Sequence, residues 1–369
     1  MLAIVLPIGL AMVVAPPATK VVMKFGGSSV RDAERITEVC KLVSQQLDDG
    51  LKPHLVCSAM GKSTNNLLSA ADRALSKGEV DLSAMRILHA ETAATLKLES
   101  SPYYLDVLTL LDECERTLEG VAMLGELSTR TRDRIVSYGE RCSGRMVAAT
   151  LEGMGIQATQ VESWDLGVMT DSTFGDARVL DACWPTINQK VAEIPEDTVA
   201  VITGFIGKDE NGAITTLGRG GSDLTASLIA AAAGYDEAQV WKDVDGILSA
   251  DPRVCPGAVP VPSVSYEEAA ELAYFGAQVS DWPWPAVGLG LQSAPSLMGG
   301  HAGRSCGRLP SLVHGCILGP VGRGLPALWH AHAGFAPACH AAVHQGGSAL
   351  PREEFVQPIG TRHAHHPVV

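Results

Sequence analysis

The stretch at residues 21–30, Val-Val-Met-Lys-Phe-Gly-Gly-Ser-Ser-Val, most constrains how this chain can fold. Its first three residues are apolar and predict a buried strand, and Lys24 stands near the end of that strand. After the two glycines, apolar residues recur at helical spacing from Ile36 to Val43. The order strand, glycine turn, helix is typical of phosphate sites, because glycines let backbone N–H groups approach an anion and a helix start adds unpaired donors. The alternative is a tight turn with an extended lysine, and the motif is not a Walker A loop.

Composition limits the classes of protein to consider. The 369 residues are 46% hydrophobic, which allows a sizeable core in two domains or in one large α/β domain with extras. The net charge of −13 argues against nucleic acid or an anionic membrane as the main partner. The nine cysteines are scattered without a C-x-x-C pair, which favours reduced thiols in an intracellular compartment over a disulfide framework.

Both ends of the chain differ from its middle. Residues 1–18 are apolar, too short to span a bilayer comfortably and similar to a targeting segment, so we exclude them from the fold. Residues 1–279 carry a net charge of −15, whereas residues 280–369 carry +2 and hold nine of the eleven histidines. We expect residues 280–369 to form a low-order tail rich in Gly, Pro and His, because no helical or strand period persists there. The histidines lack a carboxylate or cysteine set with ligand spacing, so we expect no metal site among them.

Between these ends, strands and helices alternate. The patterns predict strands at 21–23, at the end of 51–58, at 159–161, at 198–203 and from 239, with helices from 64, over 79–125 with a break at 100–102, and over 131–154 and 224–234. Asn211-Gly212 predicts a hairpin turn between short strands. Strands separated by helices predict a mainly parallel sheet covered on both faces, which is a three-layer α/β/α sandwich.

A second glycine-rich cluster, at residues 215–223, repeats the order strand, glycine turn, helix. Arg219 lies among three glycines and offers a rigid guanidinium fork to a carboxylate or phosphate. Asp223 falls at the start of the next helix, where an N-cap is the alternative role. Capping does not explain an arginine among glycines, so we favour a functional role for Arg219.

Two weaker features complete the candidates. After the strand at 239–241 come Lys242 and Asp243, then Asp245 and Arg253, which could face phosphate, a hydroxyl or Mg²⁺. Taken alone, that segment is better explained as a solvated turn. Glu140 follows a glycine on a helix, and a lone helical glutamate is usually solvated too.

Together these segments resemble the aspartate kinases of the amino-acid-kinase superfamily, over residues 19–279. The matching motifs are Lys24–Val30, Ser58–Asn65, Ser137–Glu140, Gly218–Asp223 and Trp241–Gly246, in the family's order, with Phe275–Ala277 as the last match. Lys242 and Gln278 are similar to the plant-type, plastid branch.

The resemblance implies transfer of the γ-phosphoryl group of ATP, with Mg²⁺, to the side-chain carboxylate of L-aspartate. The product would be 4-phospho-L-aspartate, the entry to lysine, threonine and methionine. The chemistry is consistent, because a carboxyl group with a pKa of about 3.9 is already ionised at neutral pH and needs no general base. The enzyme has only to hold two anions in line and neutralise developing charge.

The resemblance also implies a role for individual residues. Lys24 would bridge the ATP phosphates and act in catalysis together with Asp223. The donors to the phosphoryl group would be Gly26, Gly27 and Ser58. Thr64 would contact the reacting carboxylate, Arg219 would clamp the α-carboxylate, and Glu140 and Asp223 would hold the ammonium. Gly220, Gly221 and Ser222 complete the expected substrate site, and Lys242, Asp243, Leu248, Arg253 and Gln278 the expected nucleotide site.

The resemblance stops after Val279. There the family continues with a strand that closes the sheet and two regulatory ACT modules, whereas this chain has Ser280-Asp281-Trp282-Pro283 and the tail. A frameshift, a retained intron or an alternative exon would explain the tail. We therefore expect a sheet that lacks its last strand or strands, an exposed sheet edge, no feedback control by lysine or threonine, and an open oligomeric state. Two alternatives remain: another small-molecule kinase of the superfamily, and a truncated product without catalytic activity.

Overall fold

The computed structural model describes residues 19–242, 248–251, 253–259, 261, 263–264, 291–293 and 314–318, the last three ranges by their backbone alone. All of them belong to one unit, residues 1–324. The predicted targeting-like segment and most of the predicted tail lie outside the described residues.

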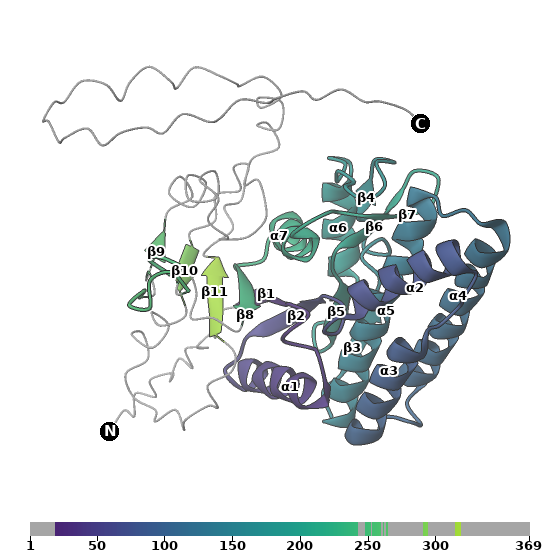
Figure 1. Ribbon diagram of the computed structural model, residues 1–369. Helices are drawn as coiled ribbons and strands as arrows, with labels where there is room; N and C mark the ends of the chain where they lie inside the picture. The colour runs from purple at the N-terminus through teal and green to yellow at the C-terminus, as the bar shows by residue number, and fades with distance from the viewer. Residues whose placement is uncertain are drawn as a thin grey trace, which may run out of the picture. The chain divides into compact units, whose positions relative to one another are not determined.

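The main sheet is built around β1, whose side chains are buried except at its first residue. Its strands follow the order β3-β5-β2-β1-β8-β11-β10-β9 (Figure 1). The pairs from β3 to β8 are all parallel, so the predicted mainly parallel sheet is confirmed. The strands of the whole main sheet are β1 (Lys20–Phe25), β2 (Lys52–Cys57), β3 (Ala158–Val161), β5 (Val199–Thr203), β8 (Glu237–Lys242), β9 (Ser263–Val264), β10 (Leu291–Ser293) and β11 (His314–Leu318).

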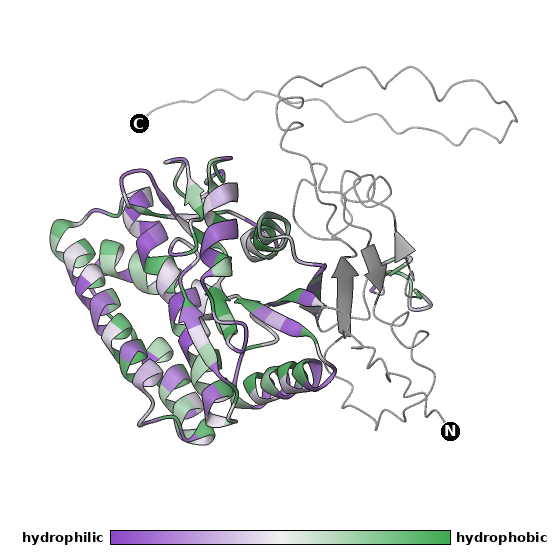
Figure 2. Cartoon of the chain, turned by 180° about the vertical axis from the view of Figure 1, so that it is seen from behind, coloured by the Kyte–Doolittle hydropathy of each residue, from purple (hydrophilic) through white to green (hydrophobic). Residues whose placement is uncertain are grey.

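Helices connect the parallel strands. Apolar residues at helical spacing give them one buried face, and Figure 2 shows hydrophilic and hydrophobic residues interleaved along α3 and α4. The helix predicted over 79–125 is two helices, broken at the expected place. The helices are α1 (Ala33–Asp48), α2 (Ser63–Lys77), α3 (Ser83–Leu96), α4 (Pro102–Leu124), α5 (Thr129–Gly153), α6 (Cys183–Ala192) and α7 (Gly221–Ala233).

Two hydrophobic clusters lie on opposite faces of the sheet. Val21, Met23 and Phe25 of β1 pack with buried residues of α1 to α5. Val22, which points the other way, packs with buried residues of α6 and α7. The period of two along β1 thus separates the two layers, and the α/β/α sandwich is confirmed.

A second, three-stranded sheet lies beside the first and has the order β4-β6-β7. Its strands are β4 (Met169–Thr170), β6 (Ile206–Asp209) and β7 (Ile214–Thr216). Strands β6 and β7 are antiparallel, and Asn211-Gly212 lies in the turn between them, as predicted.

The predicted exposed edge at β8 is wrong. Strand β11 pairs antiparallel with β8 from Ala238 to Lys242, and β10 and β9 continue the sheet. The physical reason is that strand pairing uses main-chain N–H and C=O groups, which every residue except proline supplies, so a segment without a strand-like side-chain period can still pair.

Cys40, Cys57, Cys114, Cys142, Cys183 and Cys255 are free thiols, and all of these but Cys255 are buried. None of the described helices combines the length and the apolar character needed to cross a membrane.

Candidate active site

A cavity of about 450 Å³ opens where β1, β2, β5 and β8 reach their carboxyl ends. Open α/β sheets place their ligands at this edge. Both glycine-rich turns and α5 contribute to its wall. The described residues that line it are Lys24, Gly27, Ser58, Ala59, Gly61, Thr64, Glu140, Phe205, Gly218, Arg219, Gly220, Gly221, Ser222, Asp223 and Lys242.

Lys24 and Asp223 form an ion pair across the cavity wall. Lys24 Nζ lies 2.6 Å from Asp223 Oδ1, and both residues are buried. Lys242 Nζ lies 4.0 Å from Asp223 Oδ2. One carboxylate therefore stands between two ammonium groups, which leaves this wall with a net positive charge.

The N-cap alternative for Asp223 is wrong. The N-cap of α7 is Gly220, and Asp223 lies within the first turn of the helix. Its carboxylate faces Lys24 on β1 instead of the backbone of its own helix.

The turn after β1 is held by backbone contacts. Ser29 N donates to Gly26 O at 3.0 Å, and Gly61 N donates to Gly27 O at 2.9 Å. A Cβ at Gly27 would lie 2.8 Å from Ala59 O, closer than real Cβ atoms approach. The close packing of this turn against the turn at 58–61 therefore requires glycine at position 27. The helix start expected here does not reach the cavity, because α1 begins only at Ala33 and is capped by Asp32.

The turn before α7 has a different construction. Gly218 and Gly220 have φ of +69° and +73°, a region that side chains other than glycine rarely adopt. Helix α7 starts directly at Gly221, and among the described residues no side chain caps it. Its N-terminal backbone and the positive end of its dipole therefore face the cavity.

Glu140 enters the cavity from α5 and is only 3% exposed. Its Oε1 accepts a hydrogen bond from Ala59 N at 3.3 Å, whereas Oε2 has no hydrogen-bond partner among the described residues. Burial raises the pKa of this carboxyl group to about 8, and the hydrogen bond from Ala59 opposes the shift. The cavity wall thus contains a buried carboxyl group, one oxygen of which has no hydrogen-bond donor among the described residues.

The two sides of the cavity are linked directly. Ser58, which follows β2, donates from Oγ to Ser222 Oγ on α7 at 2.9 Å. Thr64 lies in the first turn of α2 and lines the cavity nearby.

Some predicted site residues lie elsewhere. Gly26 is not in the lining, although a Cβ there would lie 3.7 Å from Lys24 Nζ. Leu248 and Arg253 do not line the cavity either, and Arg253 is exposed and paired with Asp251 at 2.7 Å. Asp243 and Gln278 lie outside the described residues.

Phe205 lines the cavity but was not among the predicted site residues. Its φ is +72°, and Ile206 N donates to Gly204 O at 2.9 Å, which closes a tight three-residue turn around Phe205. A Cβ at Gly221 would lie 2.8 Å from Phe205 Cδ2, so the phenyl ring packs against the start of α7. The strand predicted at 198–203 puts Phe205 at this edge of the sheet, but the sequence carries no signal for a phenylalanine with a positive φ.

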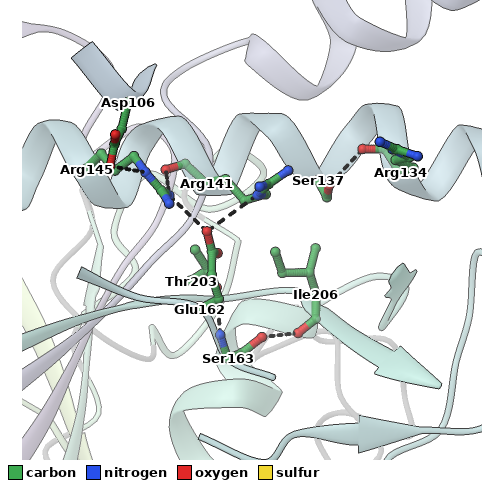
Figure 3. A network of polar contacts seen from close by, with 9 residues as sticks. All are labelled: Asp106, Arg134, Ser137, Arg141, Arg145, Glu162, Ser163, Thr203 and Ile206. Atoms are coloured by element: carbon green, nitrogen blue, oxygen red, sulfur yellow. Dashed lines mark hydrogen bonds and ion pairs between the residues drawn. The ribbon is translucent and has the colours of Figure 1, made fainter. Parts of the chain in front are cut away.

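A polar network holds α5 against this edge (Figure 3). Glu162 Oε1 accepts from Arg145 at 2.8 Å and from Arg141 at 3.4 Å. The next residue, Ser163, continues the network away from α5. Its backbone N donates to Thr203 Oγ1, and its Oγ donates to Ile206 O. The network therefore joins the helix that carries Glu140 to the turn that carries Phe205.

Comparison with known proteins agrees with this geometry. The model of the amino acid kinase family matches residues 19–282. Aspartokinase 1, chloroplastic, of Arabidopsis thaliana is 46% identical over 267 residues, which are 70% of this chain and 46% of the relative. The aspartokinase of Mycolicibacterium smegmatis is 32% identical over 70% of this chain and 49% of the relative.

A solved structure shows the same likeness. Escherichia coli aspartokinase III in complex with aspartate and ADP superposes with a TM-score of 0.62 and 30% identity, over 70% of this chain and 57% of that chain. This chain spans about half the length of the curated relatives it matches. The matched region holds all described residues of the cavity, and the chain belongs to the amino acid kinase family.

Proposed function

We propose that the chain is an aspartate kinase, which transfers the γ-phosphoryl group of ATP to the side-chain carboxylate of L-aspartate. The observation that carries the proposal is that Lys24, Arg219 and Glu140, which come from separate elements, line the same cavity. Cations for a polyphosphate, a guanidinium for a carboxylate and a carboxyl for an ammonium are the groups that ATP and an amino acid require.

In the proposed reaction, a carboxylate oxygen of aspartate attacks the γ-phosphorus while the bond to the oxygen bridging the β- and γ-phosphates breaks. The products are 4-phospho-L-aspartate and ADP, and no proton has to be removed from the nucleophile. The protein therefore contributes position and charge, not a general base.

We assign each residue of the site to the phosphates or to the amino acid. Lys24 and Lys242 hold and neutralise the phosphates, with backbone donors from Gly27 and the start of α7 and the hydroxyl of Ser58. Asp223 holds Lys24 in place by their ion pair and, together with Glu140, attracts the substrate ammonium. Arg219 binds the α-carboxylate, and Thr64 contacts the carboxylate that reacts. Gly26, Gly220, Gly221 and Ser222 shape these two turns, and Asp243, Leu248, Arg253 and Gln278 belong to the proposed nucleotide side.

The oxygen ligands available in and around the cavity decide how Mg²⁺ could bind. The described residues contain no group of three or more His, Cys, Asp or Glu side chains that could hold a metal ion. Mg²⁺ commonly binds through substrate phosphates and few protein carboxylates, so it is proposed to enter on ATP, with Asp223 as a carboxylate of the cavity wall that could hold it. When bound, it would neutralise phosphate charge.

The plant relatives also support a location. Three Arabidopsis thaliana relatives at 45% to 46% identity carry the description chloroplastic. We therefore propose that the protein acts in the plastid, where its product would enter the synthesis of lysine, threonine and methionine.

Release of ADP by the purified full chain tests the proposal. With ATP and Mg²⁺, we expect turnover with L-aspartate and little with L-glutamate, N-acetyl-L-glutamate or carbamate. Lys24→Ala should lower kcat about 10²- to 10³-fold, because it removes a cation that faces the transferred charge. Lys20→Ala, on the exposed first residue of the same strand, is the matched control and should retain activity. Equal rates for the wild type and Lys24→Ala would overturn the proposal.

A further inference from the structure

Asp133 is a buried carboxylate in the second turn of α5, outside the cavity and only 3% exposed. Its Oδ2 accepts hydrogen bonds from Thr216 N at 2.8 Å and from Gly175 N at 2.9 Å. Its Oδ1 accepts a third from Thr216 Oγ1 at 3.1 Å.

The partners of Asp133 are unusual for a buried acid. Within the part of the chain that the structure describes, no ion pair with Asp133 is recorded, and its three donors are two backbone N–H groups and a hydroxyl. Burial raises the pKa of Asp133, and these three hydrogen bonds oppose that shift. A carboxylate that is buried without a cation depends on all of its donors, so its neighbours are held in one arrangement.

The segments that Asp133 joins both lead into the cavity. Asp133 and Glu140 are seven residues apart on α5, so they lie on one face of the helix, about 10 Å apart along its axis. Thr216 ends β7 and stands three residues before Arg219. One rigid helix therefore carries Glu140 and, through Asp133, holds the strand that delivers Arg219.

We propose that Asp133 is a positioning residue that sets the spacing between Arg219 and Glu140, and so selects the backbone carboxylate and ammonium of the amino-acid substrate. The inference rests on the proposed function, because those two groups are the ones assigned to the amino acid. Phosphate binding depends on β1 and α7, which Asp133 does not touch among the described residues. Loss of the link should therefore affect the amino acid much more than ATP.

Steady-state kinetics of the full chain test this assignment. Asp133→Ala should raise KM for L-aspartate at least about tenfold, because displacement of a binding group by a fraction of an ångström is costly, while KM for ATP changes less than about twofold. Asp133→Asn should restore KM for L-aspartate to near the wild-type value. Its amide oxygen can accept from the two backbone N–H groups, and its NH₂ group can donate to the hydroxyl of Thr216.

Thr216→Val provides a milder variant that keeps the shape of the side chain and removes only the hydroxyl contact. It should raise KM for L-aspartate about two- to threefold, again without an equal change for ATP, and it answers the question if Asp133→Ala does not fold. Asp209 offers a matched control, since it is buried and accepts from Asn211 N, Ala213 N and Ser172 Oγ at the far end of β6 and β7. Asp209→Ala should lower the unfolding temperature without a selective rise in KM for L-aspartate.

Equal changes in the two KM values for the Asp133 and Thr216 variants would overturn the inference, as would unchanged kinetics with a lowered unfolding temperature. Failure of Asp133→Asn to restore KM for L-aspartate would also count against it. Absence of turnover by the wild type with L-aspartate would instead overturn the proposed function, and this inference with it.

Discussion

The two glycine-rich turns of the cavity share a sequence pattern and differ in physical construction. At the first turn, Gly27 is required by space, because a side chain there would collide with Ala59 O at 2.8 Å, and α1 begins farther along the chain. At the second turn, Gly218 and Gly220 are required by backbone conformation, with φ of +69° and +73°, and α7 begins at once. The first turn thus supplies a lysine and a tight wall, whereas the second supplies a helix N-terminus and an arginine.

The largest predicted effect concerns Glu140, which is proposed to bind the amino acid beside the second turn. If Glu140 binds an ammonium group, it must ionise, and its pKa of about 8 makes that costly at lower pH. KM for L-aspartate should therefore fall as pH rises from 6 to 8, by up to about tenfold per pH unit, and level off above 8. Glu140→Gln should remove this dependence, and KM for ATP should not follow it. A flat profile in the wild type would contradict the role of Glu140.

The same carboxyl group predicts a trend in stability without substrate. Between pH 4.5 and 8 the unfolded chain loses the Glu140 proton while the folded chain keeps it, so the free energy of unfolding should fall as pH rises through that window. Glu140→Gln should flatten this part of the curve relative to the wild type, as measured by denaturant titration. A steeper fall in the variant would contradict the raised pKa.

The steric requirement at the first turn predicts the next largest effect. Gly27→Ala should lower the free energy of unfolding by about 1–3 kcal/mol, because the backbone at Ala59 cannot easily move away. Gly26→Ala is the matched control, since its Cβ would meet only the flexible end of Lys24 at 3.7 Å. Denaturant titration of both variants measures the difference, and equal losses would refute the steric explanation.

The conformational requirement at the second turn predicts a smaller loss of stability. Gly220→Ala should cost about 1–2 kcal/mol, because alanine is disfavoured at φ of +73°. Gly234→Ala, at the other end of α7 with φ of +65° and open space around it, should cost a similar amount. Only Gly220→Ala should also raise KM for L-aspartate. If both variants raise it equally, the turn has no special part in binding.

The contact between the two sides predicts the smallest effect. Ser58→Ala removes the hydrogen bond to Ser222 and should lower the free energy of unfolding by about 0.5–1.5 kcal/mol. Ser76→Ala, which removes only a contact with Asp72 O of its own helix on the surface, should be near neutral. Indistinguishable unfolding curves for the two variants would show that the link between the sides is weak.

The sequence predicted the layers and much of the cavity because both depend on local patterns. A short run of apolar residues predicted β1, and glycines beside Lys24 and Arg219 marked the two turns that the structure brings into one cavity. What it could not predict depends on contacts between distant segments. The pairing of Asp223 with Lys24 and the hydrogen bonds of Asp133 join residues far apart in the chain. The positive φ of Phe205 belongs to a local turn, but no sequence pattern marks it. The expected contribution of the start of α1 to the phosphate site is absent from the described cavity lining, because a glycine pair alone does not tell a steric requirement from a conformational one.

Hydrogen exchange of the full wild-type chain in the presence of ADP and L-aspartate tests the central claim most directly, since it reports on both turns in one experiment. If the two turns serve one site, backbone amides in residues 24–30 and in residues 217–225 gain protection when both ligands are present, with the second segment responding to L-aspartate. Protection of one turn only, or of neither at saturating ligand, would contradict the account.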